Sequence, residues 1–163
     1  MAQLAHGALL LALVTAFFGI GAAVFGERRR IPELSLSAVR AVVGVTFLLL
    51  VADAILLTAF ITHDFSFAYV SSRSSSDMPL RYVVTAFYGG QEGSLLFWTT
   101  MASILASIAF VRNRARFPRL VPHAAATFLA LSSFFLLMLT MVRSPFEINA
   151  IVPAQGQGLN PLL

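Results

Sequence analysis

The sequence predicts an all-α integral membrane protein with about four transmembrane helices, and three observations support this prediction. The chain has 163 residues, of which 58% are hydrophobic and 11% charged, too few polar residues to cover a water-soluble domain. Four apolar stretches approach the ~20 residues that cross a hydrocarbon core of about 30 Å. All eleven basic residues are arginines, and most lie at the ends of these stretches. We therefore expect one membrane domain over residues 1–163.

Three of the four spans follow directly from long apolar runs. The first two are expected at about 4–26 and 39–61, on either side of a basic connection. The first run has no basic residue before it and is too long for the apolar core of a signal peptide, so we expect a retained helix. The fourth span is expected at about 121–142, and residues 143–163 then form a Pro/Gly-rich outer tail.

The remaining stretch, residues 83–111, is too long for a simple span. At 1.5 Å per residue it measures roughly 43 Å, and Gly89-Gly90 interrupts it. One interpretation is an interfacial lead-in over 80–92 followed by a span at about 93–111. A tilted continuous helix is the other interpretation.

The arginines also predict which way the helices run. The two short connections carry Arg28, Arg29, Arg30, Arg40, Arg112, Arg114, Arg116 and Arg119. The long middle connection, residues 62–82, has two arginines balanced by two aspartates. By the positive-inside rule, the short connections face the cytoplasm, and both termini and the middle connection face the outer, periplasmic side. Such placement explains the basic residues without nucleic-acid binding.

The middle connection contains two contrasting patterns. Residues 71–77 are serine-rich and look like a flexible linker. Just before them, Phe65, Phe67 and Tyr69 alternate along the chain. This alternation predicts a short ordered segment on the membrane surface.

Small residues form a stripe on two of the expected helices. In the first helix these residues are Ala5, Ala12, Ala16, Gly19, Ala23 and Gly26, and in the third they are Thr99, Ala102, Ala106 and Ala109. Small residues let helix backbones approach closely in lipid, so we expect both stripes to pack inside the bundle.

Two acids stand out because of their position. Asp53 lies about 8 residues inside the outer end of the second span, roughly 12 Å deep, where a charged carboxylate costs a few kcal/mol unless it is paired or hydrated. We expect it to face a cavity or a partner subunit, or to stay neutral. Glu92 follows Gly89 and Gly90, and it lies at the interface if the helix breaks at these glycines.

The sequence offers no convincing catalytic, cofactor-binding or metal site. There is no cysteine, which excludes disulfides and thiolate chemistry. His6, His63 and His123 are isolated, and we interpret them as polar residues near the interfaces rather than as haem ligands. Trp98 fits an interfacial belt or ordinary packing.

Several short motifs nevertheless follow one another along almost the whole chain. They are Leu4–Leu9, Asp64–Ser66, Tyr69-Val70, Pro79, Tyr82, Glu92–Leu96 with Trp98, Ser144–Glu147 and Leu159–Leu163. Together they resemble the beginning of the CcmF family of cytochrome c-type biogenesis proteins. The candidate residues from these motifs are Asp64, Gly89, Glu92, Gly93, Ser94, Trp98, Asn160 and Pro161. Tyr88 departs from the family, which usually has tryptophan there.

The resemblance implies a part in a haem lyase of the bacterial inner membrane, or of an organellar inner membrane for a split organellar gene. Such a lyase receives haem from a periplasmic carrier protein and joins it to apocytochrome c, together with thiol-handling proteins. The resemblance implies haem as the cofactor of the complete protein. The family's haem-ligating histidines and tryptophan-rich motif have no counterpart here, so we expect the remaining part of CcmF as a partner, from a split gene or a longer chain.

Two other functions fit the same residues. A small four-helix transporter subunit would use Asp53 and Glu92 as a proton or cation relay. A pure assembly scaffold would tolerate neutral substitution of both acids, but would not tolerate bulky residues on the Ala12, Ala16 and Gly19 face.

Overall fold

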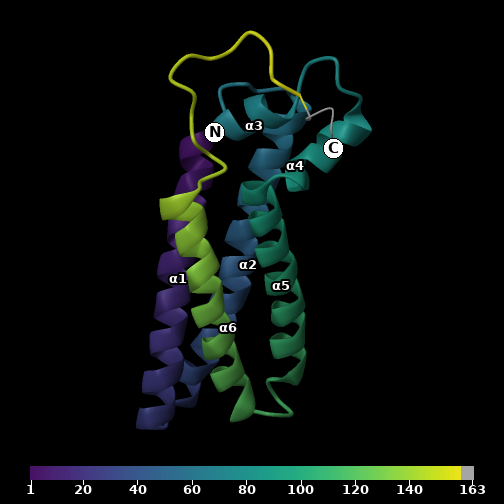
Figure 1. Cartoon of the computed structure of the whole chain (residues 1–163). Coiled ribbons are helices and arrows are strands. Elements are labelled where there is room, and N and C mark those ends of the chain that lie inside the picture. The colour runs from purple at the N-terminus through teal and green to yellow at the C-terminus, as the bar shows by residue number, and fades with distance from the viewer. Residues whose placement is uncertain (159–163) are drawn as a thin grey trace.

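The computed structural model describes residues 1–158, and four long helices form its frame (Figure 1). These are α1 (Ala2–Arg29), α2 (Pro32–Ile61), α5 (Gln91–Asn113) and α6 (Leu120–Leu137), and a π-helical turn, η1 (Met138–Val142), continues α6. Each of the four is long and apolar enough to cross a membrane, counting α6 together with η1. The predicted all-α membrane fold with four spanning helices is confirmed.

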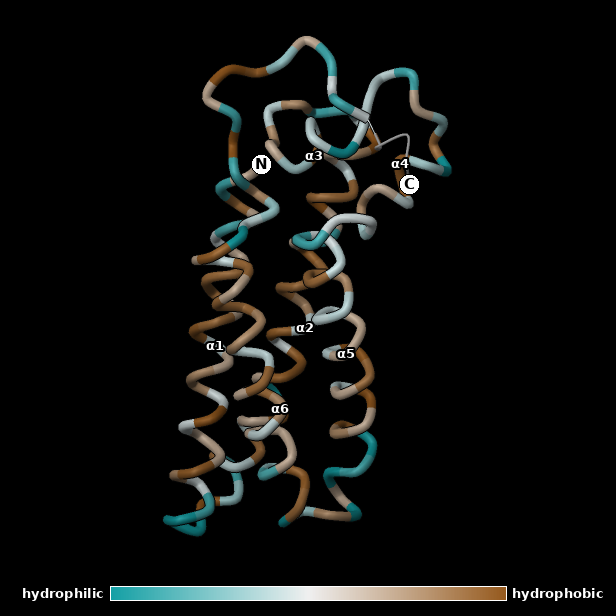
Figure 2. The backbone as a smooth tube through the Cα atoms, viewed as in Figure 1, coloured by the Kyte–Doolittle hydropathy of each residue, from teal (hydrophilic) through white to brown (hydrophobic). Residues whose placement is uncertain are grey.

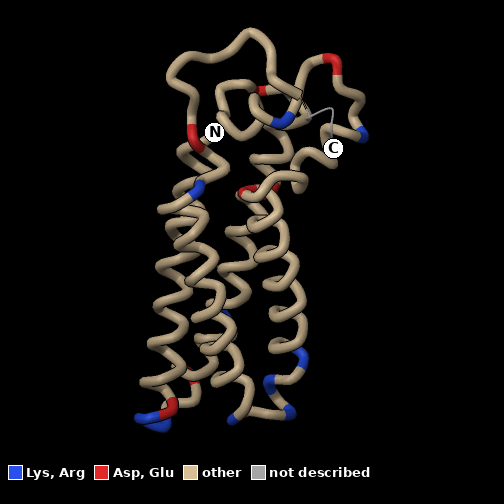
Figure 3. The backbone as a smooth tube through the Cα atoms, viewed as in Figure 1, with Lys and Arg blue, Asp and Glu red and all other residues tan. Residues whose placement is uncertain are grey.

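The bundle presents its apolar residues along its length and its polar residues at its two ends (Figure 2). Arginines gather at the end that holds the two short connections (Figure 3), which we call the arginine end. The start of α1 and residues 143–158 lie at the opposite end, which we call the outer end. Both ends of the described chain therefore lie on one side of the bundle, and the direction that the arginines predict places this side outside.

The helical hairpin of α1 and α2 is tight because small residues line its contact. Arg30 ends α1 in the left-handed conformation at φ 55°, and Pro32 opens α2 with its fixed φ. A Cβ on Gly26 would lie 2.5 Å from the Ser35 nitrogen, and one on Gly19 would lie 2.6 Å from the Ala41 Cβ. All six small residues of the α1 stripe are buried, so the predicted packing of this stripe is confirmed.

The corresponding prediction for α5 is wrong. Ala102 and Ala109 are exposed, and Thr99 is the one fully buried member of that stripe. The face that α5 turns to α2 is polar instead. The Thr46 hydroxyl of α2 donates to the Ser103 carbonyl at 3.0 Å and lies 2.8 Å from the Ser107 hydroxyl. These hydrogen bonds hold α5 at a rotation that leaves Ala102 and Ala109 outside, while Ala106 is partly buried against the core.

A folded cap covers the outer end. It consists of α3 (Ala68–Arg73), α4 (Leu80–Gly89) and residues 143–158, which pass over α3 (Figure 1). Two backbone hydrogen bonds tie the returning chain to the start of α3, from Ala68 N–H to the Glu147 carbonyl and from Asn149 N–H to the Ser66 carbonyl, both 2.8 Å. The chain here is ordered, but the helix α3 begins only after Phe67 and extends from Tyr69 into the serine-rich stretch.

One expectation for the cap needs correction. The serine-rich stretch does not behave as a flexible linker at its start, because Ser71 and Ser74 are buried and their hydroxyls donate to backbone carbonyls. The tail also contributes apolar packing of its own. Phe146 is 4% exposed and meets Phe67 edge-on at 6.5 Å between ring centroids.

Candidate functional site at the outer elbow

The most specific motif of the sequence forms an elbow between two helices. α4 ends at Gly89 and α5 begins at Gln91, while Gly90 between them is extended at φ −101° and ψ 167°. Of the two interpretations of residues 83–111, the structure shows the one in which the helix is interrupted at the glycines. α4 lies across the outer end, and its residues Val83, Ala86 and Phe87 face the protein.

Tyr69 of α3 fills the inside of this elbow. Its hydroxyl donates to the Phe87 carbonyl at 3.0 Å and accepts the Gly90 N–H at 3.1 Å. A Cβ on Gly90 or Gly93 would come within 2.5 Å of that hydroxyl, and on Gly93 it would also strike the Phe87 carbonyl. The two glycines are therefore needed for close approach of a tyrosine ring.

The surroundings of Tyr69 keep its phenol neutral. Burial raises the pKa of Tyr69 above its ordinary value of 10.0. Hydrogen bonds to the backbone of Gly90 and Gly93 and the charge of Arg73 act in the opposite direction, while the nearby Glu92 carboxylate raises the pKa further. The phenol thus keeps the proton with which it holds the carbonyl of Phe87.

Glu92 lies in the first turn of α5 and faces η1. Its carboxylate oxygen is 3.6 Å from the Arg143 guanidinium, and this is the one ion pair within residues 1–158. Glu92 is 16% exposed and Arg143 is 70% exposed. The pair joins the start of one spanning helix to the end of another.

A polar cleft of about 450 Å³ opens beside this ion pair. Arg73, Glu92, Arg143 and Glu147 place two positive and two negative charges on its wall, and the side of Tyr69 forms part of its floor. These residues come from α3, α5 and the returning chain. The cleft has the balanced charge and the accessible rim of a site for a polar protein surface rather than for an apolar ligand.

The other motif residues have more local roles. The Asp64 carboxylate accepts the Ser66 N–H at 3.1 Å and the Ser66 hydroxyl at 2.6 Å, which fixes the turn from α2 into α3. The Ser94 hydroxyl donates to the Gln91 carbonyl at 3.1 Å within α5. Trp98 is 66% exposed on the outside of α5. Gly89 has open space around it, and Asn160 and Pro161 lie outside the described residues.

Asp53 lies away from this cleft, on the polar contact between α2 and α5. Thr100 of α5 is beside its carboxyl group, and one carboxyl oxygen is buried without a hydrogen-bond partner. The Ser103 hydroxyl, close along the same face of α5, is also buried without a partner. Asp53 and Glu92 are therefore not brought together.

The three histidines lie in different parts of residues 1–158. His6 lies in the first turns of α1 and His63 follows the end of α2, while the ring of His123 in the first turn of α6 is hydrogen-bonded to the Arg119 carbonyl. None of the three lines the cleft beside Glu92 or the larger cavity at the arginine end. Residues 1–158 also contain no group of three His, Cys, Asp or Glu side chains suited to a metal ion.

Sequence reasoning missed two contributors to the cap. The sequence places Arg143 only at the start of the outer tail, and nothing in the local sequence links it to Glu92. The Asn149 side chain donates to the Phe65 carbonyl and to the Ser71 hydroxyl, both at 2.9 Å. In the sequence, Asn149 is a polar amide in a Pro/Gly-rich stretch. This does not reveal hydrogen-bond acceptors that lie 84 and 78 residues earlier.

The fold and the elbow define a multi-pass membrane protein with a structured polar cap at one end. No family model matches the chain. Cytochrome c-type biogenesis protein CycK of Rhizobium meliloti (strain 1021) is 31% identical over 161 residues, which are 99% of this chain and 24% of that protein. CcmF of Pseudomonas fluorescens is 38% identical over 116 residues, which are 71% of this chain and 18% of that protein.

A solved structure, cytochrome c heme lyase CcmF, superposes with a TM-score of 0.76 at 25% identity over 90% of this chain and 24% of that one. The chain thus spans about a quarter of the length of the relatives it matches over most of its residues. It is a homologue of the amino-terminal portion of the CcmF-type cytochrome c-type biogenesis proteins.

Proposed function

We propose that this chain supplies the first membrane helices of a cytochrome c maturation haem lyase, and that it helps deliver or attach haem to apocytochrome c on the outer face. The observation that supports this most is the similarity to a cytochrome c-type biogenesis protein over 99% of the chain. The bacterial inner membrane is the location that follows, or an organellar inner membrane for a split organellar gene.

In this proposal the chain contributes structure and a docking surface, while the haem ligands lie in the rest of the protein. None of the described histidines lines either cavity, so we assign no haem chemistry to residues 1–158. The partners are the remaining part of CcmF, the haem carrier, and apocytochrome c with its thiol-handling proteins.

The outer elbow is the surface we assign to these partners. Most of the motifs that carry the family resemblance meet at this end. Tyr69, Gly90 and Gly93 set the angle between α4 and α5, and the Glu92–Arg143 pair ties that elbow to the end of α6. A rigid cleft with alternating charges suits a polar partner surface, because charge complementarity fixes register and orientation.

Glu92 provides the test of this assignment. Glu92→Gln keeps the shape but removes the charge that pairs with Arg143, and we expect a several-fold lower yield of mature cytochrome c, measured by haem staining in cells that depend on this chain. Glu33→Gln is the control and should leave the yield unchanged, because Glu33 is exposed, lines neither cavity and makes no ion pair within the described residues.

The double variant Glu92→Arg with Arg143→Glu exchanges the two charges. It distinguishes a pair that only holds the structure from a carboxylate that partners recognise. Restored yield would mean that only the ion pair matters. A yield that stays low in the exchanged variant would mean that partners read the carboxylate itself. Normal yield with Glu92→Gln would reject any charge-dependent role and leave the scaffold function.

The structure gives little support to the hypothesis of a transporter subunit. Glu92 is paired with Arg143 at the outer end, whereas Asp53 lies beside Thr100, eight residues further along α5 and so roughly 12 Å deeper. This separation is too long for direct proton transfer between the two acids. Loss of uptake into vesicles with Asp53→Asn, with normal cytochrome maturation, would reverse this preference.

A further inference from the structure

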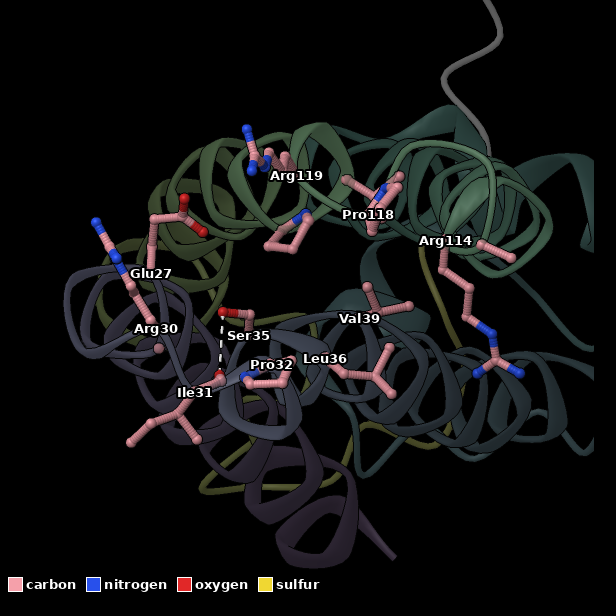
Figure 4. A pocket seen from close by; sticks show the side chains of 14 residues that line it. Glu27, Arg30, Ile31, Pro32, Ser35, Leu36, Val39, Arg114, Pro118 and Arg119 are labelled. Carbon is pink, nitrogen blue, oxygen red and sulfur yellow. Dashed lines mark hydrogen bonds between the residues drawn. The ribbon is translucent and has the colours of Figure 1, made fainter.

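A larger cavity lies at the opposite end of the bundle from the elbow. It has a volume of about 960 Å³ and lies between the α1–α2 turn and the connection from α5 to α6 (Figure 4). Leu36, Val39, Val121 and Pro122 give it apolar walls, and Val39 and Val121 are buried. Its size is at the upper end of the ~300–1,000 Å³ usual for ligand pockets.

The mouth of this cavity is strongly basic. Arg30, Arg114 and Arg119 stand on different sides of its mouth in Figure 4, with their side chains directed outward, and all three are exposed. Glu27 is the one acid among the lining residues, and it makes no ion pair with them within residues 1–158. The rim therefore holds three guanidinium groups without a carboxylate partner in the described chain.

The cavity has basic groups at its mouth and apolar groups further inside. A phospholipid has its phosphate and its acyl chains in the same order. Val39 is seven residues beyond Pro32 along α2, so the apolar part extends roughly 10 Å inward from the rim. The rim itself lies at the end of spanning helices, where lipid phosphates are found. Arginine pairs well with phosphate oxygens, and basic pockets between helices on the cytoplasmic side suit anionic headgroups.

We infer that this cavity binds one anionic phospholipid, with its headgroup at the basic mouth, toward which the exposed side chains of Arg30, Arg114 and Arg119 turn on binding, and the start of an acyl chain against Leu36 and Val39. A free phosphate would leave the apolar walls uncovered, and a neutral lipid would leave three guanidinium groups without an anion. This inference is independent of the proposed haem-lyase function, because it concerns the other end of the bundle.

The test measures binding of phosphatidylglycerol to the purified protein in a neutral detergent, by native mass spectrometry. We expect one tightly retained lipid. The triple variant R30Q/R114Q/R119Q should bind it roughly one-hundredfold more weakly, because each arginine contributes separately to attraction of an anionic headgroup. The matched control is R28Q/R112Q/R116Q, which removes the same charge from residues that do not line the cavity, and it should bind within about twofold of the original protein.

A second variant addresses the apolar part. Ala115 lines the cavity and is exposed, so Ala115→Trp should block the mouth without disturbing the core, and it should abolish lipid retention while the far-ultraviolet circular dichroism stays unchanged. Equal binding of phosphatidylcholine, displacement by excess glycerol phosphate, or an equal loss in the two triple variants would each overturn the inference. They would indicate, respectively, an apolar site, a simple anion site and diffuse attraction.

Discussion

The two ends of the bundle are built in different ways. At the outer end, the chain between α2 and α5 forms α3 and α4 and is tied to residues 143–158 by hydrogen bonds and by the Phe67–Phe146 contact. At the arginine end, residues 114–120 are all exposed and a large cavity lies beneath them. The outer end is held by many contacts within the chain. At the arginine end the α1–α2 turn packs closely at Gly26, whereas the connection from α5 to α6 is exposed.

The difference follows from the length of the connections. A long connection outside the membrane must satisfy its own backbone polar groups and can bury apolar side chains only by folding back on itself. A six-residue connection spans the gap between neighbouring helices directly and needs no core. The outer end is therefore suited to hold a defined surface, and the arginine end to accept lipid.

The largest effect should come from removing the aromatic anchor of the cap. Phe146→Ala deletes a buried ring, and we expect the cap to lose about 3 kcal/mol, seen as faster hydrogen exchange at the amides of Ala68 and Asn149. Phe117→Ala at the arginine end is the comparison, because Phe117 is 43% exposed and its loss should cost less than about 1 kcal/mol. Equal costs would remove the contrast between the two ends.

The elbow should be the next most sensitive place. Gly93→Ala forces a Cβ against the Phe87 carbonyl and the Tyr69 hydroxyl, and we expect a loss of about 2 kcal/mol in detergent unfolding measurements. Gly89→Ala is the matched control three residues before Glu92. The added Cβ meets open space at a helical residue, so this variant should leave the free energy of unfolding unchanged or raise it by up to about 1 kcal/mol. A tolerated Gly93→Ala would contradict the close approach of Tyr69.

Removing the hydroxyl of Tyr69 should have a smaller effect. Tyr69→Phe leaves the Gly90 N–H and the Phe87 carbonyl without their shared partner, and we expect a loss of about 1–2 kcal/mol in the same measurement. Tyr88→Phe, at a residue 46% exposed, should be within about 0.5 kcal/mol of the original protein. If both variants behave alike, the hydroxyl does not hold the elbow.

The same tyrosine makes the cap sensitive to alkali. Because the pKa of Tyr69 is raised in the folded protein, the unfolded chain loses the phenol proton at lower pH than the folded one. Its contribution is fully present below the ordinary value of 10.0 and is lost as the pH rises through the folded pKa. The free energy of unfolding should fall more steeply above pH 10 in the original protein than in Tyr69→Phe, and parallel curves would reject the assignment.

The smallest effect should come from lengthening the connection at the arginine end. Two glycines inserted after Arg116 should change the free energy of unfolding in lipid-free detergent by less than about 0.6 kcal/mol, because loop closure depends weakly on length. The same insertion after Phe146 displaces Glu147 and Asn149 from their partners in the cap and should cost more. A larger cost at the arginine end would mean that this connection has its own tertiary contacts.

Several features of the site were predictable for local reasons. Gly89-Gly90 interrupts an apolar run that is too long for one span, and helix geometry makes a break there the natural outcome. The partner of these glycines was not predictable, because Tyr69 is about twenty residues away and reaches them only after α3 forms. The ion pair of Glu92 likewise depends on Arg143, which is near it only because α6 returns to the outer end.

The sequence by itself determined the class of protein, the number of spanning helices and the direction that the arginines predict for them, because hydrocarbon excludes charge and fixes the length of an apolar helix. Only the tertiary structure decided which face of each helix is buried, what fills the elbow and where the cavities lie. Ala102 and Ala109 show why. Small size permits close packing, but the hydrogen bonds between Thr46 and α5 set the rotation of that helix. Such bonds depend on which residues meet across the bundle, and a single helix does not contain that information.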